Sequence, residues 1–372
     1  MEEVITLYVG LDVHKATIEV ALASEGRGGE VRAYGRIDNT PVQVAKLLAK
    51  LAKPGVALSV CYEAGPCGYE LYRQVRALGH ACCVIAPSMI PKKPGDRVKT
   101  DRRDSLMLAR LHRAGELTAI WVPDPSHEAV RDLVRARHAA MLALGRARQQ
   151  VQGFLLRYGR IYTGRSPWTR AHRVWLANQR FDHPAQHLAL EDMLAAVDTA
   201  QARMQRLEGQ ILTLLPDWSM APAVAAYQAL RGVSVLSAII LAAELGDLRR
   251  FPHPRQLMGY LGLTSSEHTS STRRRQGAIT KAGNAEARRV LVEGAHSYRL
   301  PARIAAAKLP VLQAQPEAVQ RIAWTAQARL CARTRRLRAN GRLNNIVTIA
   351  IAREMAAFLW AIAQRVPPKP AA

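Results

Sequence analysis

The chain has 372 residues, more than one hydrophobic core usually supports, so we expect two or three domains. It carries 53 Lys and Arg against 29 Asp and Glu, a formal net charge of +24, which predicts a polyanionic partner. A membrane is the rival polyanion, but the apolar stretch at residues 232 to 243 is well short of the roughly 20 residues that a spanning helix needs. Nucleic acid is therefore favoured and no membrane association is expected.

The N-terminus and the cysteines indicate the cell compartment. The acidic start Met1-Glu2-Glu3 runs directly into a strand-like segment, unlike a secretory signal, so we expect a cytoplasmic protein. The five cysteines are an odd number without paired metal-ligand spacing, and several lie in apolar runs. We interpret them as reduced, mostly buried thiols.

Residues 4 to 122 alternate between β-rich and helical runs, which is typical of an α/β domain. Strands are predicted at residues 5 to 11, 17 to 23 and 30 to 37 as an antiparallel meander, with a tight turn around His14 and Lys15. A helix at 42 to 52, a buried strand at 56 to 62, a helix at 69 to 78 and a buried strand at 81 to 85 follow. This order predicts a ribonuclease H-like sheet.

The rest of the chain is predicted to be mainly helical. Ala, Leu, Arg and Gln dominate residues 124 to 218, where apolar side chains follow a 4-3 spacing: Leu190, Leu194, Val197, Met204, Ile211 and Leu215. This helix either forms an oligomerising coiled-coil arm or packs inside its own chain. Residues 230 to 248 resemble a helix-hairpin-helix segment, and a proline-rich tail that we expect to be disordered follows residue 365. We predict domains at residues 1–123, 124–218, 219–300 and 301–372.

Four acids are placed where they can converge. Asp12 closes the first strand in GLDVHK, Glu63 closes a buried strand in CYEAGP, and Asp101 and Asp104 open a helix in KTDRRDSL. Strand ends meet at one edge of an α/β sheet, and an i, i+3 pair shares one helix face. Carboxylates this close repel unless a hard cation lies among them, so we predict an Mg²⁺ site, with Mn²⁺ as an alternative, that acts in phosphoryl transfer. Singly, Asp12 is equally explained as a turn cap and Asp101 as a helix N-cap.

A Ser/Thr cluster precedes three arginines in GLTSSEHTSSTRRRQGAITKAG. Hydroxyls beside Arg273, Arg274, Arg275 and Lys281 indicate phosphate handling, because a serine needs a base or cations to become a nucleophile. A solvated loop that grips the DNA backbone is the alternative. The residues that we assign to nucleic acid are Lys99, Arg102, Arg103, Arg273, Arg274, Arg275, Lys281, Arg288 and Arg289.

These motifs, in this order over nearly the whole chain, resemble the transposases of insertion-sequence family one-ten, relatives of the Piv-type DNA invertases. The resemblance implies a RuvC-like DEDD domain formed by Asp12, Glu63, Asp101 and Asp104, a coiled-coil region, and a transposase domain with a nucleophilic serine at Ser270. It also implies donor and target DNA, a guide (bridge) RNA, and a homo-oligomer from dimer to tetramer.

The chain departs from the family pattern at two positions. The usual Ser-Gly is Ser270-Ser271 here, which makes Ser271 an alternative nucleophile, and Ser265 replaces the usual proline after Gly-Leu-Thr. The hypothesis is a Mg²⁺-assisted serine recombinase. The alternatives are a metal-dependent nuclease or junction resolvase that uses water, and a non-catalytic basic RNA- or DNA-binding protein.

Overall fold

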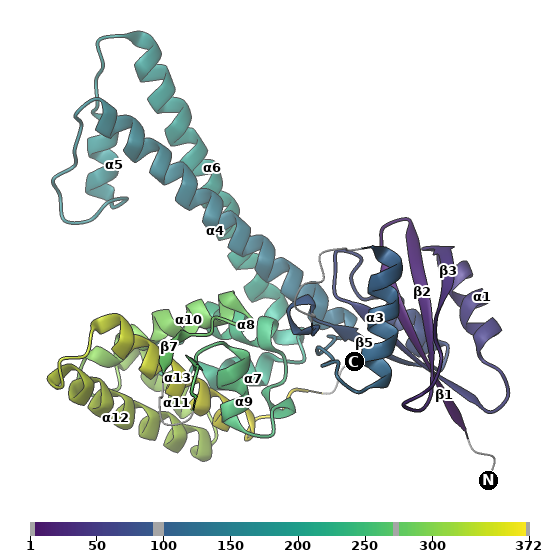
Figure 1. Ribbon diagram of the computed structural model, residues 1–372. Helices are drawn as coiled ribbons and strands as arrows, with labels where there is room; N and C mark the ends of the chain where they lie inside the picture. Colours follow the sequence, from purple (N-terminus) through teal and green to yellow (C-terminus); the bar gives the residue numbers. More distant parts are fainter. Residues whose placement is uncertain (1–3, 92–99, 271–274, 370–372) are drawn as a thin grey trace. The chain divides into compact units, whose positions relative to one another are not determined.

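The computed structural model describes residues 4–91, 100–270 and 275–369, and its ribbon is shown in Figure 1. The chain divides into two compact units, Met1–Val122 and Pro123–Ala372, which are described separately. The first is a mixed α/β unit and the second is mainly helical.

The N-terminal unit is built on one five-stranded sheet. Its strands are β1 (Ile5–Val13), β2 (Thr17–Ser24), β3 (Val31–Asp38), β4 (Val56–Glu63) and β5 (Ala81–Ile85). They lie in the order β3-β2-β1-β4-β5; β1 to β3 form an antiparallel meander, whereas β1, β4 and β5 are parallel. The predicted strands and the predicted meander are confirmed.

Helices cover both faces of this sheet. α1 (Pro41–Leu51) and α2 (Glu70–Ala77) bury Leu47, Leu48 and Val75 against one face, in a core that includes Leu11 and Tyr62. α3 (Asp101–Arg113) covers the other face, and a short 3₁₀ turn, η1 (Pro87–Met89), precedes it. Because side chains alternate along a strand, the even-numbered residues near the end of β1 face α3.

α3 runs antiparallel to β1 and β4. Near its end, His112 hydrogen-bonds Ser59 of β4 (Nε2 to Oγ, 2.8 Å) and packs edge-on against Tyr8 of β1. In its middle, the helix backbone approaches Gly10 so closely that an added Cβ would lie 2.4 Å from the nitrogen of Ala109. The first turn of α3 therefore lies near the carboxyl ends of β1 and β4.

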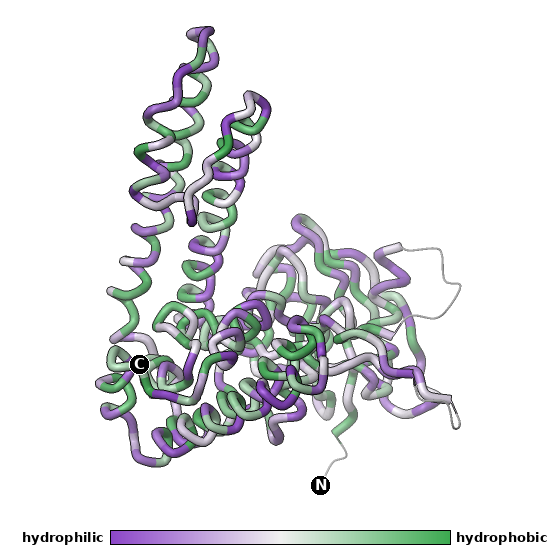
Figure 2. Tube along the Cα trace, turned by 90° about the vertical axis from the view of Figure 1, so that its left-hand side faces the viewer, coloured by the Kyte–Doolittle hydropathy of each residue, from purple (hydrophilic) through white to green (hydrophobic). Residues whose placement is uncertain are grey.

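A helical arm opens the C-terminal unit. α4 (Pro125–Arg157) packs along α6 (Pro184–Leu214), and α5 (Arg170–Ala177) lies between them in sequence. Along both long helices the hydropathy alternates, as expected of amphipathic helices (Figure 2). Leu190 and Val197 of the 4-3 pattern are buried against α4, and Arg137 of α4 pairs with Glu208 at the seam. The heptad face thus packs within the chain, and self-association through the arm stays a prediction.

The remainder of the unit surrounds one large core that contains Leu241, Leu291 and Met355. Its elements are η2 (Leu215–Asp217), α7 (Ala221–Tyr227), α8 (Val235–Leu245), η3 (Leu248–Arg250), α9 (Pro254–Tyr260), β6 (Ser265–Glu267), β7 (Gln276–Ile279), α10 (Ala285–Ala295), η4 (His296–Arg299), η5 (Ala306–Lys308), α11 (Leu309–Gln313), α12 (Glu317–Ala339) and α13 (Asn344–Ala363). The predicted helix, turn and helix around Gly232 is present as α7 and α8; the backbone of Gly232 packs against that of Gly294 in α10.

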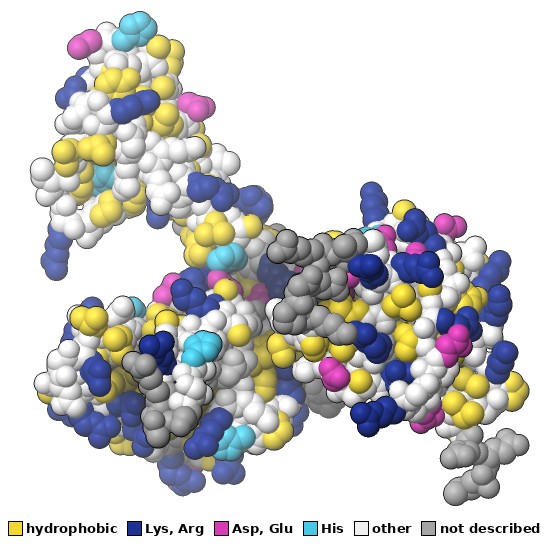
Figure 3. Space-filling view, in the orientation of Figure 1, with side chains coloured by type: hydrophobic (Ala, Val, Ile, Leu, Met, Phe, Trp, Pro, Cys, Tyr) yellow, Lys and Arg dark blue, Asp and Glu magenta, His cyan; other side chains and the backbone are white. Residues whose placement is uncertain are grey.

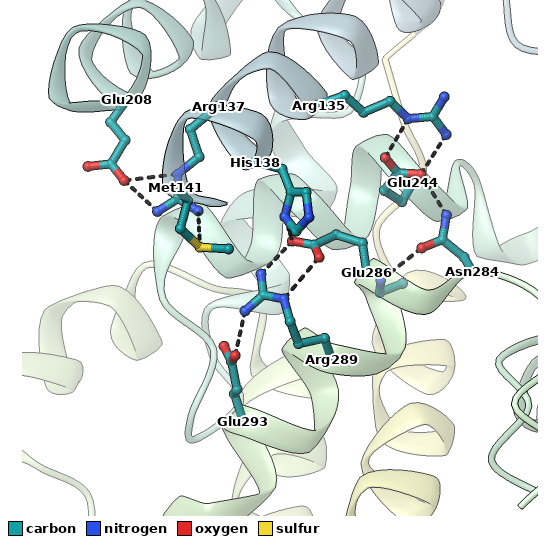
Figure 4. A network of polar contacts seen from close by, with 11 residues as sticks. Arg135, Arg137, His138, Met141, Glu208, Glu244, Asn284, Glu286, Arg289 and Glu293 are labelled. Atoms are coloured by element: carbon teal, nitrogen blue, oxygen red, sulfur yellow. Dashed lines mark hydrogen bonds and ion pairs between the residues drawn. The ribbon is translucent and has the colours of Figure 1, made fainter. Parts of the chain in front are cut away.

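A polar network ties α4 to this core (Figure 4). Glu244 of α8 is only 5% exposed, and it accepts from Arg135 of α4 at 2.9 and 3.0 Å and from Asn284 Nδ2 at 2.6 Å. The Oδ1 of Asn284 also caps α10 by accepting from the backbone N–H of Ala287. One buried carboxylate therefore fixes the start of α10 relative to α4 and α8.

One described helix, α13, is long and apolar enough to cross a membrane by length and composition alone. About 44% of its most apolar window is buried inside the protein, and its buried residues belong to the large core. The tail after it is held in place up to Lys369, whose backbone N–H donates to Ser219 at 2.9 Å. This differs from the disorder expected of a proline-rich tail, because Val366 packs against the core.

Candidate active site

The four predicted acids lie at one end of the N-terminal sheet. In the parallel pairing of β1 with β4, Leu11 is opposite Tyr62, so Asp12 and Glu63 occupy the next register position on neighbouring strands. They lie two residues beyond Gly10 and Cys61, which pack against α3, and therefore face the same helix. Asp101 and Asp104 lie on the first turn of α3, which arrives at this end.

Local sequence explains where α3 begins and why Asp101 does not cap it. Thr100 caps α3, its side-chain oxygen accepting from the backbone N–H of Arg103 at 3.3 Å. Asp101 is thus the first helical residue. The alternative interpretation of Asp101 as the helix N-cap is wrong, because Thr100 has that role. Both aspartates also lie in the first turn, where the helix dipole favours negative charge.

Two residues that sequence reasoning missed complete the cluster. His14 follows β1, and its Nε2 lies 3.3 Å from Asp12 Oδ2 and 3.5 Å from Asp101 Oδ1. Arg36 of β3 reaches Asp101 with Nη2 at 3.7 Å and Glu19 with Nε at 3.1 Å. His14 lies two positions after Asp12 in GLDVHK, so its proximity was readable, whereas the approach of Arg36 depends on the pairing of β2 with β3.

The pKa of Asp12 reflects the crowding of three carboxylates. Burial raises the pKa of Asp12, the nearby charges of Asp104 and Asp101 raise it further, and His14 opposes the increase. The Asp12 side chain is 16% exposed, while that of Asp101 is 46% exposed and open to solvent. Negative charge is therefore concentrated at a partly desolvated position.

This donor set fits a divalent cation. One ligand atom each from Asp12, His14 and Asp101 lies within 4.8 Å of the others, and carboxylate oxygens are the ligands that Mg²⁺ and Mn²⁺ prefer. A cation there would relieve the repulsion that raises the pKa of Asp12. The structure thus brings Asp12, Asp101 and Asp104 together, with Glu63 at the adjoining strand end.

The predicted serine lies on a hairpin of the C-terminal unit. β6 and β7 pair antiparallel, and the backbone N–H of His268 donates to the Arg275 carbonyl at 2.9 Å. Ser270 lies between these residues and is exposed to solvent. Ser271, Arg273, Arg274 and Lys99 lie outside the described residues.

The other predicted nucleic-acid residues fall into two groups. Arg102, Arg103, Arg275 and Lys281 are exposed. Arg288 instead donates to the Leu261 and Ala282 carbonyls at 2.9 and 2.8 Å, and Arg289 pairs with Glu286 and Glu293. Arg288 and Arg289 are therefore held by partners within the chain.

Two family models match the chain. Residues 9–159 match one described as a transposase of the IS110 DEDD type, and residues 225–308 match one described as "Transposase IS116/IS110/IS902 family". The putative transposase y4qE of Sinorhizobium fredii is 48% identical over 357 residues, which is 96% of this chain and 88% of the relative. The chain belongs to the IS110/IS116/IS902 transposase family.

Further relatives extend the family match. The transposase for insertion sequence element IS1533 of Leptospira borgpetersenii is 31% identical over 335 residues, covering 89% of this chain and 96% of the relative. A probable family 20 transposase of Pseudomonas aeruginosa is 27% identical over 363 residues, 96% of each chain. The DEDD transposase model spans all four acids of this family member, and the second model spans Ser270.

Proposed function

We propose that this transposase cuts and joins DNA by attack of Ser270 on a phosphodiester held at the acidic site. The observation that supports this best is the convergence of Asp12, Glu63, Asp101 and Asp104 at one end of the N-terminal sheet. DNA is the substrate expected of a transposase family, and Lys and Arg outnumber Asp and Glu on the faces drawn in Figure 3. In this proposal the N-terminal unit is a RuvC-like, ribonuclease H-like domain.

The four acids would hold Mg²⁺, or Mn²⁺ in its place, with His14 as a further donor beside Asp12 and Asp101. A divalent ion held by these residues would supply Lewis-acid chemistry, polarising the phosphodiester and stabilising charge on the attacking and leaving oxygens. The chain's own contribution is orientation, because α3 is fixed on β1 by Gly10 and carries two of the acids. Arg36 neutralises part of the charge of Asp101 and limits its side-chain movement.

The serine step balances in atoms and protons. A bond forms between Ser270 Oγ and phosphorus as the bond from phosphorus to one deoxyribose oxygen breaks. The proton lost by the serine hydroxyl is matched by one gained by the leaving oxygen. Arg275, exposed on the same hairpin, can stabilise charge on the phosphate. The phosphoserine bond conserves the energy for rejoining, and Ser271 is the alternative attacking residue.

The acids and the serine belong to different units of the chain. We propose that they act together within a homo-oligomer, from dimer to tetramer, in which one subunit supplies acids and another supplies the serine. A guide RNA that pairs with donor and target DNA is the partner that the family resemblance implies. The net charge of +24 is compatible with both nucleic acids.

Trapping the covalent link tests the proposal. The purified protein is incubated with Mg²⁺, guide RNA and suicide DNA whose cut strand cannot be rejoined, and any protein–DNA adduct is digested and mapped by mass spectrometry. We expect DNA attached at Ser270, loss of the adduct in Ser270→Ala, and its retention in Ser265→Ala, a matched serine on the same hairpin.

Each rival function gives a different result. Cut DNA with no attached peptide means that water is the nucleophile, as in a metal-dependent nuclease or junction resolvase. An adduct at Ser271 identifies Ser271, rather than Ser270, as the nucleophile. No cutting, with unchanged nucleic-acid binding in Asp12→Asn, means a non-catalytic binding protein.

A further inference from the structure

A cavity of about 240 Å³ lies in the C-terminal unit, away from the serine hairpin in sequence, between the middle of α12 and the loop before α11. The residues of its wall that carry polar or aromatic groups are Arg231, Arg303, Lys308, Trp324 and Gln327. None of the described residues that line it is acidic. A ligand with negative charge and an aromatic part therefore suits this wall.

Gln327 is an unpaired polar side chain in the wall of this cavity. It is only 7% exposed, and its Nε2 is buried without a hydrogen-bond partner in the described structure. Buried amides are almost always hydrogen-bonded, and leaving one unpaired is unfavourable. Because Nε2 is sealed from solvent, it can meet a ligand acceptor in the cavity only after the amide turns about χ3, which exchanges the positions of its oxygen and nitrogen.

Trp324 lies one helical turn before Gln327 on α12 and lines the same cavity, yet its side chain is 48% exposed. A large aromatic surface at a cavity mouth provides a stacking platform for a planar ring. Trp324 and Gln327 are an i, i+3 pair, so both can contact one ligand from the same helix face.

The cations around the cavity differ in how they are engaged. Lys308 Nζ donates to the carbonyls of Gln228 and Val233, at 2.5 and 2.6 Å. These hydrogen bonds hold the lysine within its own unit. Arg231 donates to the Pro301 carbonyl at 2.8 Å through one of its nitrogens. Arg303 is exposed and, within the described residues, forms neither a hydrogen bond nor an ion pair, so its guanidinium is available to a phosphate.

We propose that this cavity binds one unpaired nucleotide of a nucleic acid. The base stacks on Trp324, an acceptor on the base edge pairs with the Gln327 amide, and the phosphate lies at Arg303. The volume suits a single base, whereas a duplex cannot present a splayed-out base without unpairing it. The inference rests on the proposed function only in taking nucleic acid as the partner, and it requires neither the metal nor the serine.

The experiment uses full-length protein carrying Ser270→Ala, in EDTA, so that its outcome is independent of the cutting chemistry. Short single-stranded DNA and RNA oligonucleotides, each with one 2-aminopurine, are titrated while the base fluorescence reports stacking. We expect quenching on binding, and a loss of affinity of about 5- to 150-fold in Trp324→Ala, with partial recovery in Trp324→Phe. The arm that binds more tightly, DNA or RNA, identifies the source of the nucleotide.

Two further variants separate a binding role from a structural one. Gln327→Leu should weaken binding about 2- to 10-fold while the unfolding temperature stays the same or rises, because the unpaired amide is removed. Leu343→Ala, at a side chain that is 67% exposed and outside the cavity, should change neither quantity. Unchanged quenching in Trp324→Ala overturns the proposal. So does a loss of affinity in Trp324→Ala that is as large for a fully paired duplex as for the single strands.

Discussion

The close approach of α3 to β1 gives a sharp prediction for Gly10→Ala. A Cβ at this position would lie 2.4 Å from Ala109 N, 2.5 Å from Ser105 O and 2.9 Å from Ala109 Cα. All three are backbone atoms of α3, so no side chain can rotate to make room. Since ordinary contact begins at 3.4 Å, the helix has to move away by about 1 Å.

The movement has two measurable consequences. Overpacking of this kind costs roughly 1–3 kcal/mol in the free energy of unfolding, which lowers the unfolding temperature of the N-terminal unit by several degrees. It also displaces Asp101 and Asp104 from Asp12, and metal ligands tolerate only about 0.2 Å of error. We therefore expect the apparent affinity for Mg²⁺ to fall by more than the loss of stability alone explains.

The assay is thermal unfolding and metal titration of the full-length variant. Gly28→Ala is the matched control, because its added Cβ meets nothing within 4 Å and it lies in the same unit. This control should be neutral or slightly stabilising, through the unfolded chain. Wild-type stability and wild-type metal affinity in Gly10→Ala would refute the packing that we derive for the site.

Further predictions concern the C-terminal unit and nucleic-acid binding. Asn284→Asp keeps the cap of α10 but faces the buried carboxylate of Glu244, so it should lower the free energy of unfolding at pH 8 more than Asn284→Ala does; a loss confined to Asn284→Ala would show that only the cap matters. Burial lowers the pKa of His127, so its contribution to stability is present above about pH 6.5 and is lost as pH falls, by at most about 1.4 kcal/mol per pH unit. Urea unfolding of His127→Gln should show a shallower decline below pH 6.5, and exposed His296→Gln should match the wild type. Replacing residues 273 to 275 by Gln should reduce the slope of log binding constant against log salt by about one for each lost phosphate contact, and an unchanged slope would place them outside the interface.

Sequence reasoning located the strands and the four acids because each signal is local. Asp12 and Glu63 end apolar runs, and the pairing of parallel strands then brings strand ends together. The N-cap was missed although its signal is also local: the sequence indicates Asp101 as a candidate for that role, whereas Thr100 caps α3. These features need no knowledge of distant contacts.

Other parts of the site depend on tertiary packing and were not readable. Arg36 reaches Asp101 only because β3 pairs with β2 beside β1, and Gly10 is needed only because α3 crosses it. The role of α6 was undecided in the sequence, because a heptad face looks the same whether its partner is α4 or another chain. The unpaired amide of Gln327 likewise appears only when the surrounding helices are in place.

Catalysis at the end of the N-terminal sheet requires that its four acids bind one divalent cation. Isothermal titration of Mg²⁺ or Mn²⁺ into the full-length protein tests it directly, with Asp12→Asn and Glu63→Gln compared with Glu70→Gln, an exposed acid of the same unit. We expect saturable binding by the wild type and Glu70→Gln, and its loss in the other two variants. Equal binding by all four proteins, or none by the wild type in the presence of DNA, would contradict it.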